Sequence, residues 1–183
     1  MGNEMQCIYW NQMSQYKFCI LCYNEHFSRY VSGNRKIMIV LAVLSSGAVA
    51  GWAIWNKFSF IWAIIVASTQ VLTIINEFLP YKSRIKEIPE LVCKLEIIYD
   101  EMEREWYSIA SGEVENAEIN NALYKYKEKW RDVSGKYFTF DALPDKECIK
   151  NKANKLKQEY YKNLFEGDVN NAIQQQTEQH TNT

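Results

Sequence analysis

Two long apolar runs dominate the pattern of hydrophobic and polar positions along the chain. Residues 37–54, "IMIVLAVLSSGAVAGWAI", and residues 58–75, "FSFIWAIIVASTQVLTII", are each 18 residues long and carry no charge. With their flanks, both approach the roughly 20 residues that a helix needs to cross a hydrocarbon core of ~30 Å. The "WNK" between them is long enough for a tight turn. The pattern predicts a transmembrane hairpin; a buried hairpin in a soluble bundle is the alternative.

Amphipathic helices are predicted on both sides of this hairpin. Residues 4–32 place aromatic side chains on one helical face, and the pair Gly33-Asn34 ends that pattern. No stretch is typical of a strand, so we expect an all-α fold. The predicted segments are an N-terminal cytosolic amphipathic helix over 1–34, the hairpin over 35–80 (helices at about 37–54 and 58–77), a cytosolic helical domain over 81–166, and a disordered tail over 167–183.

The cytosolic segment begins with a long apolar stripe. From Ile85 to Ile109, apolar residues recur at spacings of three and four, and Glu and Lys fill most other positions. This spacing is typical of a coiled coil that joins subunits, or of one face of a helix in a monomeric bundle. Pro89 should mark a first turn or a kink. After a break at 111–118, the same periodicity predicts helices over 117–136 and 145–166.

Small and polar residues mark faces of the two apolar helices. Gly47 and Gly51 form a GxxxG pattern, which permits close helix packing in lipid, within the hairpin or between subunits. A stripe along the second helix comprises Ala63 and the polar residues Gln70, Thr73 and Glu77. An amide in lipid is costly unless it faces another helix or water. The stripe therefore predicts either pore-lining residues in a ring of subunits or hydrogen bonds between helices.

The distribution of charge predicts the orientation of the hairpin. The net charge is −1, and Lys57 is the only charged residue between Lys36 and Glu77. Basic residues flank both outer ends of the hairpin, so the positive-inside rule predicts that both termini lie in the cytosol. We expect no signal peptide, because the first 36 residues are polar and aromatic. Five cysteines without a disulfide-scaffold spacing favour a reducing compartment.

The chain shows few signs of catalytic chemistry. It contains no nucleophile–histidine motif, glycine-rich phosphate loop or metalloprotease motif, so we expect neither an enzyme nor a cofactor. Cys19, Cys22 and His26 share a helical face and include possible zinc ligands, but no fourth ligand is evident, and buried thiols are the simpler interpretation.

A basic and aromatic stretch is the strongest candidate for a ligand site. "YKYKEKWRD" at 124–132 alternates cations with aromatic rings, and such groups together can contact phosphates and stack on bases. The alternative is the solvated face of an amphipathic helix. The candidate ligand-binding residues are Lys125, Lys127, Lys129, Trp130, Arg131 and Lys136.

The order of these parts resembles that of the SLATT family. The resemblance rests on an aromatic N-terminal helix, a tight hairpin with small residues and tryptophans ("SSGAVAGWAIW…FIWAIIVASTQVL"), and the long helices after it, over roughly residues 5–165. The resemblance implies a two-transmembrane antiphage defence effector associated with nucleotide signalling. No separate nucleotide-sensing domain is present in this chain, so a ligand would bind the cytosolic helices or a partner protein would sense it.

The predicted function is an oligomeric effector of the bacterial inner membrane that forms a gated ion channel or pore. Its expected partners are further copies of the chain, the lipid bilayer, a nucleotide or oligonucleotide ligand, and a nucleotidyltransferase. The alternative is a membrane-anchored coiled-coil scaffold that binds a partner enzyme without conducting ions.

Overall fold

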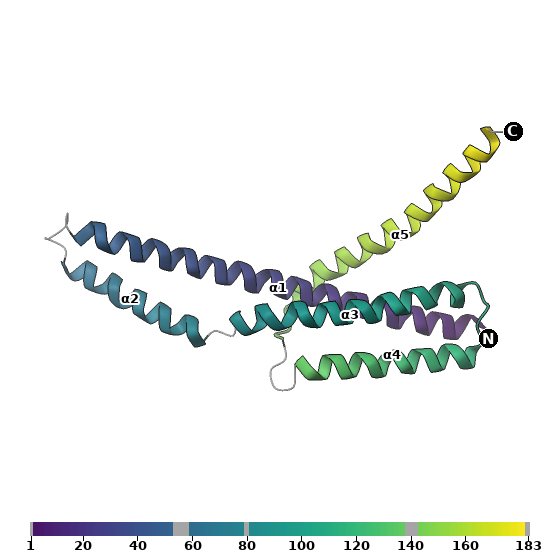
Figure 1. Cartoon of the computed structure of the whole chain (residues 1–183), viewed down its shortest axis with the longest axis horizontal. Helices are drawn as coiled ribbons and strands as arrows, with labels where there is room; N and C mark the ends of the chain where they lie inside the picture. Colours follow the sequence, from purple (N-terminus) through teal and green to yellow (C-terminus); the bar gives the residue numbers. More distant parts are fainter. Residues whose placement is uncertain (1, 53–58, 79–80, 138–142, 182–183) are drawn as a thin grey trace. The chain divides into compact units, whose positions relative to one another are not determined.

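The computed structural model describes residues 2–52, 59–78, 81–137 and 143–181, and all its regular structure is helical (Figure 1). The side chains of 44–52, 75–78 and 165–181 are among those outside the description. Among described residues there is no strand, as the all-α prediction requires. The helices are α1 (Gly2–Trp52), α2 (Ser59–Phe78), α3 (Tyr81–Ala110), α4 (Asn116–Tyr137) and α5 (Glu147–Thr181).

The ends of the helices follow local backbone chemistry. At the end of α3, the Gly112 N–H donates to the Ile109 carbonyl oxygen at 3.1 Å. Gly112 has a φ of +80°, a conformation that glycine adopts without steric cost and that commonly ends helices. At the start of α4, the N–H groups of Glu118 and Ile119 both donate to the Glu115 carbonyl oxygen. A break therefore separates α3 from α4, between the first two predicted helices of the cytosolic domain.

The chain divides into two compact units. Unit 1 comprises Met1–Glu25 with Leu91–Thr183, and unit 2 comprises His26–Glu90. Unit 1 is a helical bundle whose core consists of side chains from α1, α3, α4 and α5. Its buried apolar residues are Tyr9, Met13, Tyr16, Ile20, Leu91, Val92, Leu95, Ile98, Tyr99, Met102, Ile109, Ile119, Leu123, Tyr126, Ile149 and Ala153.

The apolar stripe of α3 is buried by helices of the same chain. The Tyr9 hydroxyl donates to the Met102 carbonyl oxygen at 3.2 Å, and the Gln6 amide donates to the Ile109 carbonyl oxygen at 2.8 Å. Leu95 and Met102 are fully buried. Of the two interpretations of this spacing, the structure favours the face of a bundle helix. Within unit 1, helices of the same chain cover this stripe, so it is not free to pack against another subunit.

Two helices extend past the ends that the sequence predicts. α1 runs without interruption through Gly33 and Asn34, where the sequence predicts an end. One glycine inside a helix costs about 1 kcal/mol relative to alanine, which the helical segments on either side outweigh. α5 continues to Thr181, although the sequence predicts disorder after residue 166. The glutamines and alanine of that tail are compatible with helix.

Pro89 lies within α3, beyond its first turn. Because proline has no N–H, it cannot donate to the carbonyl group four residues earlier, that of Ile85. The break of the backbone ladder therefore falls in unit 2, next to the boundary between the units at Glu90 and Leu91.

The predicted transmembrane hairpin is not confirmed. Among the described residues, no helix combines the length and the apolar character that crossing a bilayer requires. The first predicted span, at about 37–54, extends past the end of described α1. The second, at about 58–77, begins before described α2 and includes several side chains outside the description.

Candidate functional site

The predicted basic and aromatic stretch lies on α4, but its residues differ in their surroundings. The Lys129 ammonium donates to Glu101 Oε2 on α3 at 2.5 Å, with both side chains about two-fifths exposed. This pair lowers the pKa of the Glu101 carboxyl, chiefly through the hydrogen bond from Lys129. Lys129 thus already contacts a carboxylate within the bundle, which makes it a weaker candidate for binding phosphate.

Trp130 packs inside unit 1. Its ring lies 3.9 Å from that of Tyr16 on α1, with an angle of 4° between the planes. Burial raises the pKa of Tyr16 to about 12, and the nearby Arg131 guanidinium opposes that shift. Tyr16 therefore covers one face of the indole. On that face, Trp130 cannot stack on a ligand base as the sequence predicts.

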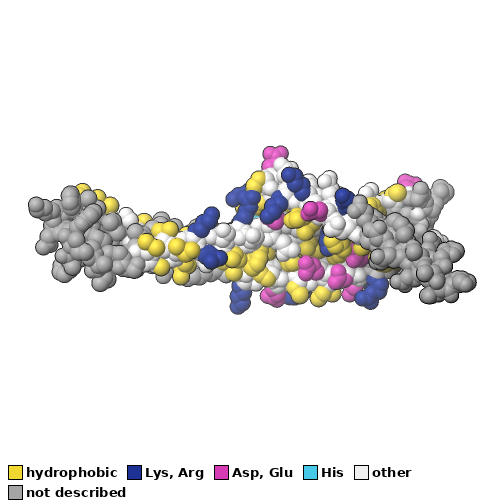
Figure 2. All heavy atoms as spheres, turned by 90° about the horizontal axis from the view of Figure 1, so that it is seen from above, with side chains coloured by type: hydrophobic (Ala, Val, Ile, Leu, Met, Phe, Trp, Pro, Cys, Tyr) yellow, Lys and Arg dark blue, Asp and Glu magenta, His cyan; other side chains and the backbone are white. Residues whose placement is uncertain are grey.

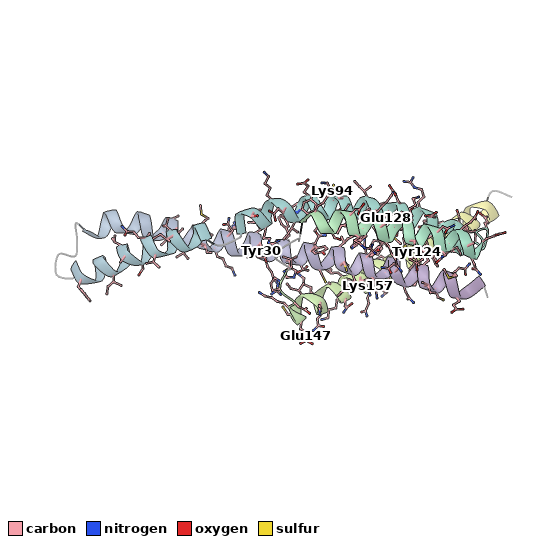
Figure 3. All side chains as sticks on the ribbon, turned by 90° about the horizontal axis from the view of Figure 1, so that it is seen from below. Tyr30, Lys94, Tyr124, Glu128, Glu147 and Lys157 are labelled. Carbon is pink, nitrogen blue, oxygen red and sulfur yellow. The ribbon has the colours of Figure 1, made fainter. Side chains whose placement is uncertain are left out.

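The remaining predicted ligand residues are more accessible. Lys125 and Lys127 place their ammonium groups 5.2 and 5.3 Å from the ring centres of Tyr126 and Tyr124. Figure 3 labels Tyr124 and Glu128 on this helix. Lys125, Arg131 and Lys136 are exposed. The helix therefore presents cations to solvent, with carboxylates among them at Glu128 and Asp132.

The predicted pore stripe lies in unit 2 and is described in part. Gln70 and Thr73 on α2 are exposed. The Thr73 hydroxyl donates to the Thr69 carbonyl oxygen at 2.9 Å, one turn earlier in the same helix. The side chains of Ala63 and Glu77 lie outside the described residues. Gly47 and Gly51 are helical within α1, but their surroundings also lie outside the description.

Unit 2 exposes large apolar side chains on both long helices. Val43 on α1 is 63 % exposed and Phe60 on α2 is 76 % exposed. Figure 2 shows such apolar side chains in yellow on the described part of the unit 2 surface. The exposed large apolar residues of this unit are Val31, Met38, Ile39, Val40, Val43, Phe60, Ile64, Val66, Val71 and Ile74.

A cation cage in unit 1 was not predicted from the sequence. The Lys17 ammonium on α1 lies 3.8 Å from the ring centre of Tyr160 and 4.5 Å from that of Tyr99. The Glu103 carboxylate accepts hydrogen bonds from the hydroxyls of Tyr160 at 2.8 Å and Tyr99 at 3.3 Å. Burial lowers the pKa of Lys17, while the carboxylate of Glu103 opposes that shift. We call Tyr99, Glu103 and Tyr160 the Lys17 cage.

Further aromatic contacts join the three helices that carry Lys17 and its cage. Trp10 on α1 lies 5.1 Å from Trp106 on α3 and 4.9 Å from Tyr161 on α5, measured between ring centres. The hydroxyls of Tyr99 and Tyr161 are 3.3 Å apart. Lys157, labelled in Figure 3, places its ammonium 5.5 Å from the ring centre of Phe18. The segment of α1 in unit 1 is therefore joined to α3 and α5 by rings and cations.

A second acidic group lies inside the bundle. Glu105 on α3 acts on the pKa values of Tyr9 and Tyr126, and its Oε2 is buried without a hydrogen-bond partner among the described residues. Burial, followed by the negative charge of Glu105, raises the pKa of Tyr9. Burial likewise raises the pKa of Tyr126, with the Glu105 hydrogen bond as the next cause. Both tyrosines therefore keep their protons well above neutral pH.

Comparisons with known proteins leave the family open. No protein-family model, curated protein or solved structure matches the chain. The resemblance to the SLATT family therefore stays a prediction.

The three possible zinc ligands, Cys19, Cys22 and His26, belong to both units. Cys19 and Cys22 are half-buried in unit 1, and His26 is buried at the start of unit 2. Burial raises the pKa of both thiols, that of Cys22 to about 11. A raised pKa disfavours the thiolate that binds zinc. Within the described part of the chain, no group of three histidine, cysteine or acidic residues is placed to hold a metal ion.

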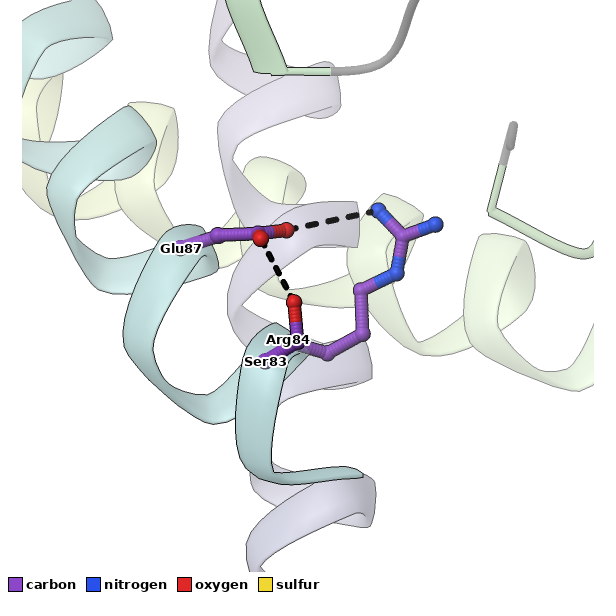
Figure 4. A network of polar contacts seen from close by, with 3 residues as sticks. All are labelled: Ser83, Arg84 and Glu87. Carbon is purple, nitrogen blue, oxygen red and sulfur yellow. Dashed lines mark hydrogen bonds and ion pairs between the residues drawn. The ribbon is translucent and has the colours of Figure 1, made fainter. Parts of the chain in front are cut away.

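Unit 2 also contains a small polar network at the start of α3 (Figure 4). The Ser83 hydroxyl donates to Glu87 Oε1 at 2.5 Å, and a guanidinium nitrogen of Arg84 lies 3.9 Å from Glu87 Oε2. Arg84 is buried, although the sequence predicts it among the basic residues that flank the hairpin. The Arg84 guanidinium is therefore largely shielded from solvent.

Proposed function

We propose that the chain is an oligomeric effector of the bacterial inner membrane that forms a gated ion channel or pore in antiphage defence. The apolar segments at about 37–54 and 58–77 form its transmembrane hairpin, and both termini lie in the cytosol. A nucleotide or oligonucleotide ligand at the cytosolic helices controls opening. The antiphage role and the signalling ligand follow from the resemblance to the SLATT family.

The apolar exposure of unit 2 is the observation that supports a membrane position. Met38, Ile39 and Val40 on α1 are consecutive and each about half exposed. Consecutive residues of an α-helix point about 100° apart, so these three span more than half of its circumference. Leaving apolar surface in water is unfavourable by about 25 cal/mol per Å². A helix that is apolar around most of its surface is typically buried in protein or in lipid.

The exposed polar residues on α2 support a conducting assembly. In lipid, the Gln70 amide needs a polar partner, because an unsatisfied amide costs several kcal/mol in hydrocarbon. The Thr73 hydroxyl already donates to the backbone of its own helix and tolerates either environment. In a ring of subunits, Gln70 faces either water or a neighbouring helix. The first arrangement lines a pore.

A ligand opens or closes such a pore only if it binds one state more tightly. Lys125, Arg131 and Lys136 on α4 are the exposed cations of the predicted ligand set. We assign them to the phosphates of the ligand, while Lys129 and Trp130 hold α4 within unit 1.

Recording currents from the purified full chain in planar bilayers tests this function. We expect discrete conductances for the wild type, altered unitary conductance for Gln70→Leu, and near wild-type conductance for Gln70→Asn, which keeps the amide. Val71→Leu is the matched control, because Val71 is an exposed apolar neighbour on the same helix. All variants should form the same oligomer in detergent.

Two outcomes would count against the proposal. Unchanged currents in Gln70→Leu would show that the stripe does not line the path. A silent bilayer from intact wild-type oligomers would favour the membrane-anchored scaffold, in which the polar stripe only joins helices.

A further inference from the structure

We propose that the Lys17 cage is a binding site for alkylammonium ions, that Lys17 is its built-in ligand, and that soluble amines of the polyamine class compete with Lys17 for it. This inference concerns unit 1 alone and does not rest on the proposed pore.

The cage has the chemistry of a cation site. Two tyrosine rings face the Lys17 ammonium at 3.8 and 4.5 Å, within the roughly 6 Å over which a ring attracts a cation. The carboxylate of Glu103 supplies the opposite charge. A primary ammonium on an alkyl chain matches both features, because its charge meets the carboxylate and its methylenes pack on the rings.

The walls of the cage are held in place by groups other than Lys17. Two tyrosine hydroxyls donate to the Glu103 carboxylate. Tyr99 is fully buried, and its hydroxyl lies 3.3 Å from that of Tyr161. The rings of Tyr160 and Tyr161 meet edge to face, with centres 5.3 Å apart. We therefore expect the cage to persist when Lys17 is shortened, which leaves room for a soluble cation.

The site is also reachable from solvent. Lys17, Glu103 and Tyr160 are half-buried, in contrast to Tyr99. A soluble amine can therefore reach the cage without unfolding the bundle. When it does so, α1 loses the contacts of Lys17 with the rings of Tyr99 and Tyr160. The apolar contacts of Tyr9 and Met13 and the ion pair between Glu25 and Lys152 remain.

Chemical rescue tests the inference on the full chain in detergent. We expect Lys17→Ala to lower Tm by about 4 °C, because the substitution removes two cation–π contacts at a half-buried site. n-Butylammonium at millimolar concentration should restore at least half of that loss. The neutral isostere n-butanol and potassium chloride at the same concentrations should not. Equal recovery with n-butanol would overturn the inference, because the site would then recognise only an apolar chain.

Two further variants keep the test decisive. Lys17→Ala combined with Glu103→Gln should need at least fivefold more n-butylammonium for the same recovery. Lys17→Met keeps the apolar stem without the charge, which protects the fold if the alanine variant does not fold. It should melt below the wild type, and a Tm equal to or above the wild-type value would show that the cage does not select a cation.

Competition should also be visible in the wild type. n-Butylammonium should speed amide hydrogen exchange in α1 around Lys17, relative to n-butanol, and leave α4 unchanged. Unchanged exchange at saturating amine would show that Lys17 is not displaced.

Discussion

Replacing Trp130 by alanine distinguishes a packing role from a ligand-binding role for the α4 stretch. Trp130 stacks on Tyr16 at 3.9 Å, and Tyr16 is buried. Truncating a fully buried tryptophan costs about 3–5 kcal/mol. Because Trp130 is only half-buried, we expect Trp130→Ala to lower the free energy of unfolding by about 2 kcal/mol. For a chain of this size, that corresponds to a fall in Tm of about 4–8 °C.

The assay is thermal unfolding followed by near-ultraviolet circular dichroism, which reports the packing of aromatic rings. Arg131→Ala is the matched control, since Arg131 is the exposed neighbour of Trp130 on the same helix. It should change the free energy of unfolding by less than about 0.5 kcal/mol. A double-mutant cycle with Tyr16→Ala should give a coupling energy of about 1 kcal/mol for the stacked pair.

A wild-type Tm for Trp130→Ala would refute this reasoning. If that variant also lost binding of a nucleotide, the original prediction of a base-stacking residue would be restored. Additive effects of Trp130→Ala and Tyr16→Ala would show that the two rings stabilise the bundle independently of each other.

Three further predictions follow from the same contacts. Burial raises the pKa of Tyr9, Tyr99 and Tyr126 above their ordinary value of 10.0, so the folded state keeps protons that the unfolded state releases. Stability should therefore be complete below a pH of about 10 and fall above it by about 1.4 kcal/mol per pH unit for each tyrosine, which alkaline unfolding measures. Lys129→Ala should cost less than about 1 kcal/mol in chemical unfolding, because its pair with Glu101 is partly exposed and screened by solvent. At pH 8, a thiol reagent should modify Cys22 at least about tenfold more slowly than a free cysteine, because its raised pKa leaves less thiolate. Peptide mapping of the labelled protein measures this rate.

The all-helical fold could be predicted, because the spacing of apolar residues distinguishes helices from strands. The stripe from Ile85 to Ile109 and the break before α4 appear directly in the order of residues. The end of the first helix at Gly33 was predicted wrongly, because a local glycine signal is weaker than the helical preference of its flanks. Local signals of about 1 kcal/mol are outweighed where long helices continue on either side.

The candidate site was harder to predict because its contacts join distant parts of the chain. The alternation of cations and rings on α4 is visible in the sequence, but it does not reveal that Trp130 meets Tyr16 or that Lys129 meets Glu101. Lys17 and its cage come from three helices, and no spacing within any one of them signals the site. A lone lysine among aromatic residues on an otherwise apolar helical face is the only available sign.

The apolar stripe of α3 is buried inside unit 1, which limits the surfaces through which copies of the chain can associate. Assembly through that stripe would expose buried residues such as Leu95 and Met102, at a cost of about 2–3 kcal/mol each. Association through α2 requires no such opening, since Gln70 and Thr73 are already exposed. We therefore expect Thr73→Phe to lower the number of subunits in detergent, because a bulky ring obstructs close approach of helices.

The matched variant is Ile97→Phe, at an exposed position of α3 outside the buried stripe. Light scattering coupled to size-exclusion chromatography should give it the wild-type mass. The opposite result, in which Ile97→Phe dissociates the oligomer and Thr73→Phe leaves it intact, would place the contact between subunits on the outer face of α3. Gln70 would then lack a neighbouring subunit to face, and the pore itself would lose its main structural support.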